Sequence, residues 1–206
     1  MPTEAELLEE RQRKLGEIRR SGINPYPYTF DVTAHAADLH QKYGPLEKEQ
    51  VTKDKVRVAG RIMALRRMGK ITFASVQDST ARIQLYLKEE DLGAERYEFL
   101  KLLDIGDWVG AGGEIFKTKT GEVTVWVRSL DLLAKSVRPL PDKWHGLADV
   151  EQRYRQRYLD LIINPEARRR LELRTRIVSA VRDFLVQKKF LEVETPILQP
   201  VYGGAN

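Results

Sequence analysis

Between residues 55 and 134 the chain alternates apolar and polar side chains, and this pattern constrains its fold more than any other feature. The segments KVRVAGRIMALR at 55–66, ITFASVQD at 71–78 and ARIQLYLK at 81–88 carry the alternation. A period of two residues is that of β-strands with one buried face and one exposed face. In the first strand we expect buried Val56, Val58, Ile62 and Ala64 and exposed Arg57, Arg61 and Met63.

The rest of this segment predicts one helix and two more strands. A helical pattern covers 89–104, and strands at 107–119 and 122–133 flank a turn at Thr120-Gly121. Three strands, a helix and two strands is the order of an OB-fold barrel, so we predict a mainly β fold with a five-stranded barrel at 55–135. Glycine within a strand indicates a bulge or a sharp corner, and the fourth strand holds Gly110, Gly112 and Gly113.

Helices are predicted before the barrel, in a segment that covers 1–54. Apolar residues recur near the helical period over 4–21, which predicts a helix that Gly22 ends. A second, shorter helix is expected at 33–43, and a linker rich in lysine and glutamate follows it.

The residues after the barrel predict a linker with a helix at 136–164. A proline-rich connector occupies 136–147, and a helix is expected at 150–163. Asp149 and Gln152 have the spacing of a capping pair at the start of that helix.

A final segment at 165–206 combines a long helix with a strand. Asn164 followed by a proline is typical of a helix start, and the helix is expected to run to about residue 188. LEVETPIL at 191–198 predicts a strand, and Gly203-Gly204 a turn. The helix carries an apolar stripe that needs a covering surface, which a partner molecule or the rest of a domain could provide equally well.

Composition excludes several kinds of site. The absence of cysteine rules out disulfides and thiolate metal ligands. His35, His40 and His145 are scattered without acidic partners at ligand spacing, so we expect no metal site. No run approaches the ~20 apolar residues of a membrane span, and the acidic start of the chain lacks the apolar run of a signal peptide. We therefore expect a cytoplasmic protein with no membrane contact.

The net charge of +5 is concentrated after the barrel, because 136–190 contain 13 basic and 7 acidic residues. A polyanionic partner would explain the excess. An arginine-rich helix face in solvent is the more common source of such an excess.

The outward face of the barrel predicts a binding surface for single-stranded RNA. Phe73 can stack on a base, Gln84 and Glu122 can bond base edges, and Arg66 and Arg67 can reach a phosphate or a base. The strand pattern turns the following outward: Phe73, Ser75, Gln84, Tyr86, Glu122, Thr124 and Trp126. Periodicity alone leaves open that the aromatic residues pack beneath a helix or loop, because an OB-fold does not fix its ligand.

Several segments, in order along the chain, resemble lysyl-tRNA synthetases, a class II aminoacyl-tRNA synthetase family. The matching segments are RRMGKITF at 66–73, RIQLY at 82–86, KTKTGE at 117–122, RPLPDKWHGL at 138–147, RYRQRYLDLI at 153–162 and FLEVETPILQP at 190–200. The resemblance implies an anticodon-binding OB-fold followed by the start of a class II α+β catalytic domain. It implies that Phe73 stacks on a base of the tRNA(Lys) anticodon loop, and that Arg66, Gln84 and Glu122 contact the central uridine.

The resemblance also implies that the helix and strand at 165–198 are class II motif 1, through which such enzymes form homodimers. We expect Ile177, Val181, Phe184 and Pro196 at that interface. Family members usually have glycine before the Phe-Leu-Glu-Val run, where the helix ends in a left-handed residue. This chain has Lys189 there, which we expect to cost about 1 kcal/mol or to change the exit geometry.

The motifs that bind ATP in class II enzymes are absent from this sequence. No glycine-rich motif 3 and no arginine-bearing motif 2 occur, nor does a Walker loop or a catalytic triad. We therefore expect no catalytic residue and no cofactor within these 206 residues, which alone should be inactive, whereas the full-length enzyme would use ATP and Mg²⁺. Alternatives are a stand-alone tRNA-binding module, a general single-stranded nucleic-acid binder, or an enzyme that charges aspartate or asparagine. Arg66, Glu122 and RPLPDKWHGL argue against the last.

Overall fold

The computed structural model describes residues 3–141, 147 and 149–197, which fall in two compact units, Met1–Leu140 and Pro141–Asn206. The predicted segments at 1–54 and 55–135 both lie in the first unit.

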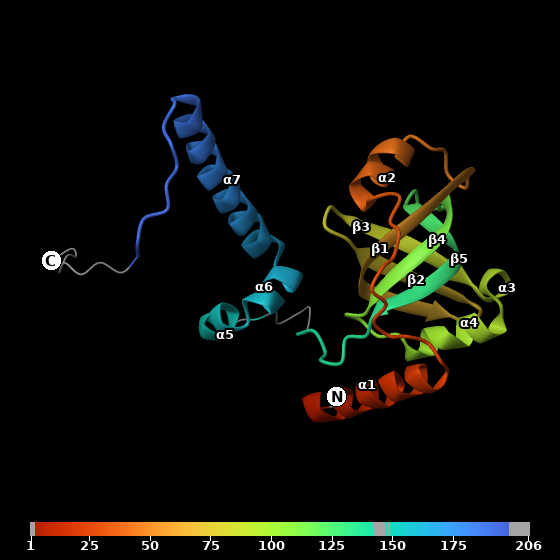
Figure 1. Cartoon of the computed structure of the whole chain (residues 1–206). Helices are drawn as coiled ribbons and strands as arrows, with labels where there is room; N and C mark the ends of the chain where they lie inside the picture. The colour runs from red at the N-terminus through yellow and green to blue at the C-terminus, as the bar shows by residue number, and fades with distance from the viewer. Residues whose placement is uncertain (1–2, 142–146, 148, 198–206) are drawn as a thin grey trace. The chain divides into compact units, whose positions relative to one another are not determined.

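Five strands in the first unit close into a barrel (Figure 1). They are β1 (Val51–Met68), β2 (Ile71–Gln77), β3 (Arg82–Lys88), β4 (Trp108–Lys117) and β5 (Val123–Ala134). The order round the barrel is β1-β2-β3-β5-β4, with β3 and β5 parallel and every other pair antiparallel. The predicted five-stranded OB-fold is confirmed.

The alternation of the sequence correctly identifies most of the barrel core. Val125 and Val127 have no exposed surface, and Val76, Leu85 and Leu87 are 1% exposed. Burial of an aliphatic side chain contributes about 1.5–3 kcal/mol, so these positions hold the barrel closed. Helices cover its two ends: α2 (Ala36–Tyr43) lies at one end, and α4 (Ala94–Phe99) and α1 (Glu4–Arg20) lie at the other (Figure 1).

A β-bulge in β1 reverses the predicted burial of Met63 and Ala64. Ile62 pairs with Val76 and Ala64 with Ser75, which leaves Met63 as the extra residue. Met63 is buried and Ala64 is partly exposed, the reverse of the prediction. A bulge inserts one residue into the period of two, so every side chain after Met63 changes face.

The three glycines of β4 allow close approaches, and the predicted bulge lies beside Gly112 and Gly113, in the paired strand β5. Gly112 pairs with Ser129 and Gly113 with Val127, so Arg128 is the extra residue of a bulge in β5. A Cβ atom on Gly113 would lie 1.9 Å from the carbonyl oxygen of Trp126. No side chain fits at that distance.

Two predicted helices of the first unit have different limits. The segment at 89–104 is broken into α3 (Glu89–Leu92), α4 and the 3-10 helix η1 (Leu100–Leu102), because Gly93 has a φ of +82°. Helix α2 begins three residues later than predicted. Thr33 instead donates its N–H to the carbonyl of Arg57, 2.9 Å away, and so follows β1.

Ion pairs and hydrogen bonds fasten α1 to the end of β5. The buried Arg11 guanidinium donates to the carbonyl oxygens of Ser136, Arg138 and Ile105 at 2.9–3.2 Å. Beside it, Asp104 accepts from Lys14 and Lys135, both at 2.6 Å. The α1 helix is therefore part of the barrel unit.

The second unit contains α5 (Val150–Arg155), α6 (Arg157–Ile163) and α7 (Pro165–Gln187). The single helix predicted at 150–163 is interrupted at Gln156, whose φ and ψ are −110° and 50°. Asn164 caps α7 as predicted, because its side chain accepts from the N–H groups of Glu166 and Ala167.

The end of α7 has the left-handed geometry that favours glycine, although the residue is lysine. Lys189 has a φ of +66°. Its backbone N–H donates to the carbonyl oxygen of Val186, and the N–H of Phe190 donates to the carbonyl oxygen of Leu185. These two bonds define a Schellman motif.

The strand predicted at 191–198 is not formed in its described residues, 191–197. A strand exists only when its backbone groups pair with a neighbour, and this segment pairs with none of the described residues. Residue 198 and the turn predicted at Gly203-Gly204 lie outside the described part of the chain.

Candidate nucleic-acid interface

A row of paired residues crosses the outer face of the barrel, one from each strand. Arg66 pairs with Phe73, Phe73 with Tyr86, Tyr86 with Trp126, and Trp126 with Glu114. Residues paired across strands share a face. The row therefore begins at a guanidinium, passes over three aromatic rings and ends at a carboxylate.

The rings form a continuous surface. Ring centroids lie 5.3 Å apart between Phe73 and Tyr86, and 5.5 Å apart between Tyr86 and Trp126. Phe116 joins them from β4, 5.6 Å from both Tyr86 and Trp126. None of these four residues is fully buried, so part of the aromatic surface remains accessible to a base, which stacks on such rings.

Arg66 reaches this surface only because of the bulge at Met63. Without the extra residue, Arg66 would lie on the same face as Val58 and Ile62, inside the barrel. With it, Arg66 is exposed beside Phe73, and its side chain makes no hydrogen bond or ion pair with any residue that the structure describes.

The side chain of the neighbouring Arg67, which we also expected to reach a phosphate or a base, is hydrogen-bonded within the protein. Its Nη2 atom donates to the carbonyl oxygens of Leu100 and Leu103 at 2.7 and 3.1 Å. These bonds tie β1 to η1. Of the two arginines, Arg66 is the one available to a ligand.

Gln84 is held in a polar chain beneath the aromatic row. Its Nε2 atom donates to the hydroxyl of Thr124 at 3.2 Å, and that hydroxyl donates to the carbonyl of Glu122 at 3.1 Å. The sequence pattern predicts that Thr124 points outward, and its pairing with Gln84 places it on that face. It nevertheless has no exposed surface.

The β4–β5 hairpin places Glu122 at the edge of the same surface. Its N–H donates to the Thr118 hydroxyl at 3.0 Å, and Gly121 supports the turn with a φ of +90°. Lys117 fastens the hairpin by donating to the carbonyl oxygens of Gly44 and Leu46. The Glu122 carboxylate is thus exposed on an anchored loop.

These residues enclose a groove of about 540 Å³. All four predicted anticodon contacts, Arg66, Phe73, Gln84 and Glu122, line it. Sequence analysis missed the contributions of Phe116, Lys117 and Lys119. Alternation about the buried Ile115 could have placed Phe116 on the outer face.

One end of the groove is fixed by ion pairs. Trp126 donates its indole N–H to Asp91 at 2.8 Å. Arg128 stacks over the same ring, with its guanidinium carbon 4.7 Å from the centroid, and pairs with Asp91 and Glu114. These contacts leave Trp126 little freedom, which suits a rigid platform.

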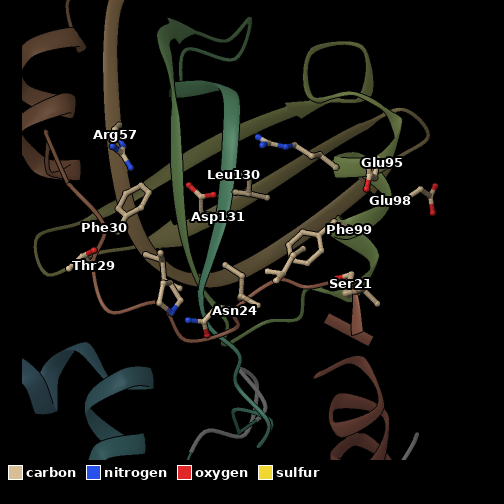
Figure 2. Close-up of a pocket in the computed structure, with 16 residues that line it drawn as sticks. Ser21, Asn24, Thr29, Phe30, Arg57, Glu95, Glu98, Phe99, Leu130 and Asp131 are labelled. Atoms are coloured by element: carbon tan, nitrogen blue, oxygen red, sulfur yellow. The ribbon is translucent and has the colours of Figure 1, made fainter. Parts of the chain in front are cut away.

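A larger hollow, of about 850 Å³, lies elsewhere on the first unit (Figure 2). Figure 2 shows Phe30 and Arg57 at one side and Glu95 and Glu98 at the other. Its charged groups are of both signs, and several have partners on the protein: Arg57 lies over the Phe30 ring, and Glu98 pairs with Lys101. The hollow therefore presents no set of groups that converge on one ligand.

The predicted interface residues of α7 are exposed. Ile177, Val181 and Phe184 are 56–57% exposed, and Pro196 is exposed in the segment after the helix. No group of histidine and carboxylate side chains in the described residues could hold a metal ion. Within the same residues, every helix is too short or too polar to span a bilayer.

Comparison with known proteins finds a matching domain family for each of the two units. Residues 56–133 match the OB-fold nucleic acid binding domain of the tRNA anticodon family, and residues 149–206 match the class II tRNA synthetases of the D, K and N group. The barrel thus resembles an anticodon-binding OB-fold, and the second unit resembles a class II tRNA synthetase domain.

Within that class its relatives are lysine–tRNA ligases. The chain is 51% identical over 200 residues to the enzyme of Carboxydothermus hydrogenoformans, covering 97% of this chain and 40% of the relative. It is 50% identical over 194 residues to the enzyme of Methanoculleus marisnigri, covering 94% of this chain and 38% of that relative. The predicted resemblance to lysyl-tRNA synthetases is confirmed, and the chain spans about two fifths of the length of these relatives.

Proposed function

We propose that the chain is the anticodon-binding part of an enzyme that attaches lysine to tRNA(Lys) with ATP, and that it acts in the cytoplasm. The observation that carries the proposal is the groove lined by a free arginine, a partly exposed aromatic ring, an amide and a carboxylate. Stacking on Phe73 would hold a base, and Gln84 and Glu122 would bond its edge. Arg66 can bond either a base or a phosphate.

ATP and Mg²⁺ would be bound by other residues of the enzyme. The described residues offer no cluster of metal ligands, and the sequence lacks motifs 2 and 3. We expect the 206-residue chain by itself not to exchange pyrophosphate into ATP in the presence of lysine. Exchange above a no-protein control would contradict that expectation.

The anticodon proposal is tested by titrating the chain with stem-loop RNAs that carry U or C at the central anticodon position. Wild type should prefer U. Phe73→Ala should weaken both loops by ~1–3 kcal/mol, the range for one base stacked on an aromatic ring. Tyr28→Ala is the matched control, because Tyr28 is 99% exposed and lies outside the groove.

Substitution of the polar residues Gln84 and Arg66 should change the base preference and the salt dependence of binding. Gln84→Ala should reduce the U-over-C preference, whereas Gln41→Ala on exposed α2 should not. Arg66→Ala should weaken binding more at low salt than at high salt, because a phosphate contact is screened by counterions. Equal affinity of wild type for the two loops would instead favour a general single-stranded nucleic-acid binder.

We also propose that α7 and the segment after it contribute to a homodimer, through Ile177, Val181, Phe184 and Pro196. The support is that Ile177, Val181 and Phe184, which belong to the apolar stripe of α7, are each more than half exposed. Val181→Glu should reduce self-association in sedimentation experiments without lowering the melting temperature of the barrel. Unchanged self-association would contradict the proposed interface.

A further inference from the structure

Thr124 lies beneath the floor of the groove, next to a residue that would touch the base. It pairs with Gln84 on β3 and with Phe116 on β4, and it does not line the groove. Its side chain has no exposed surface. A ligand in the groove therefore cannot reach Thr124, which can act only through its neighbours.

The donor and acceptor roles of the Thr124 hydroxyl can be assigned from its two hydrogen bonds. A hydroxyl carries one hydrogen, and Thr124 donates it to the Glu122 carbonyl. The oxygen can then only accept from Gln84, and the group that donates to it is Nε2, at 3.2 Å. This bond uses one of the two Nε2 hydrogens and fixes which end of the amide lies beside Thr124, so the Oε1 atom lies at the other end and is available to accept from a ligand.

We propose that Thr124 is a positioning residue that orients Gln84 with its amide oxygen toward the bound base. This inference rests on the proposed anticodon function. An amide oxygen only accepts hydrogen bonds. It pairs with the N3–H of uracil but not with N3 of cytosine, which is itself an acceptor. The buried hydroxyl thereby converts an amide that could satisfy either base into one that selects uracil.

The test compares Thr124→Val with Thr124→Ser in the full 206-residue chain, again with stem-loops carrying U or C at the central position. Valine keeps the branched shape and removes the hydroxyl, so the Gln84 amide is free to rotate. The U-over-C ratio should fall about three- to tenfold, the worth of one neutral hydrogen bond. Serine keeps the hydroxyl and should preserve the ratio.

Thr72→Val is the matched control, because Thr72 is also a buried barrel threonine, 1% exposed, and its hydroxyl bonds to Tyr97 away from the groove. It should lose stability without losing the U-over-C ratio. Side-chain amide NMR signals of Gln84 should move toward solvent-exposed values in Thr124→Val and stay in place in Thr124→Ser.

The outcomes separate this inference from the function on which it rests. If wild type prefers U and Thr124→Val keeps the full preference, the positioning role of Thr124 is wrong and the anticodon proposal stands. The same holds if Thr124→Ser loses as much preference as Thr124→Val. If wild type has no preference, both proposals fall.

Discussion

The two units of this chain differ in how many of their apolar side chains they bury. In the barrel, strands and helices bury one contiguous core that includes Ile18 of α1, Leu39 of α2 and Leu100 of η1. In the described part of the second unit, Ala167 is the one buried apolar residue, and Ile177 and Phe184 are more than half exposed. The barrel buries its apolar side chains by its own packing, whereas α7 leaves most of its apolar side chains exposed among the described residues.

Amide hydrogen exchange should show the largest difference between the units. Backbone amides of the barrel strands open only with global unfolding, while amides of 190–197 lack strand partners. We expect protection of the strands to exceed that of 190–197 by at least about 10³-fold, given ordinary domain stabilities. Uniform protection of both units in a monomer would contradict the comparison.

The same substitution should have unequal effects in the two units. Leu85→Ala removes a side chain that is 1% exposed and should destabilise the barrel by about 2–5 kcal/mol. Leu173→Ala, at 45% exposure on α7, should change stability by less than about 0.5 kcal/mol. Urea unfolding followed by tryptophan fluorescence measures the barrel, and far-UV circular dichroism measures the helices; comparable losses would show that α7 packs into a core.

A smaller effect is expected from the ion pairs that join α1 to the barrel. Burial alone would raise the pKa of Asp104, but the hydrogen bonds from Lys135 and Lys14 outweigh it and hold that pKa below its usual value. Asp104→Asn should cost about 1.5–3 kcal/mol at neutral pH, the worth of a hydrogen bond to a charged group.

The dependence on pH follows from the direction of that shift. A pKa lowered in the folded state contributes stability above the unfolded value, near 3.9, and loses it as pH falls through the folded value. The difference in melting temperature between wild type and Asp104→Asn should therefore be constant from pH 7 to about pH 5 and shrink below pH 4. A difference independent of pH would mean that the carboxylate charge is not what stabilises the site.

The smallest prediction compares two helix ends with the same geometry. Helices α1 and α7 both end in Schellman motifs, with Gly22 at a φ of +78° in one and Lys189 at +66° in the other. Lys189→Gly should stabilise the last turn of α7 by about 1 kcal/mol, and Gly22→Lys should destabilise α1 by a similar amount. Amide exchange of the last helical turn measures each change, and an unprotected Lys189→Gly helix end would contradict it.

Sequence periodicity predicts the barrel core and the outward position of Phe73 and Gln84, because both depend on a strict period of two. It does not predict the face on which Arg66 lies. That face depends on one extra residue at Met63, and the segment IMAL offers no turn or glycine signal for a bulge.

Other errors of prediction arose where pairing, not local preference, decides the structure. The segment at 191–197 has strand-forming residues but no partner strand among the described residues. Thr124 has the correct alternation for an outer face, yet neighbouring side chains cover it. Both outcomes depend on contacts between segments far apart in the sequence, which a single-sequence pattern does not contain.

The Arg11 guanidinium has a practical consequence for anyone who modifies the start of this protein. It holds the carbonyl groups of Ser136 and Arg138, 125 and 127 residues further along the chain. Affinity tags, fusions and shortened versions that disturb the first dozen residues would therefore act on the connector that leaves the barrel. The two ends of the barrel unit are best engineered as a single piece.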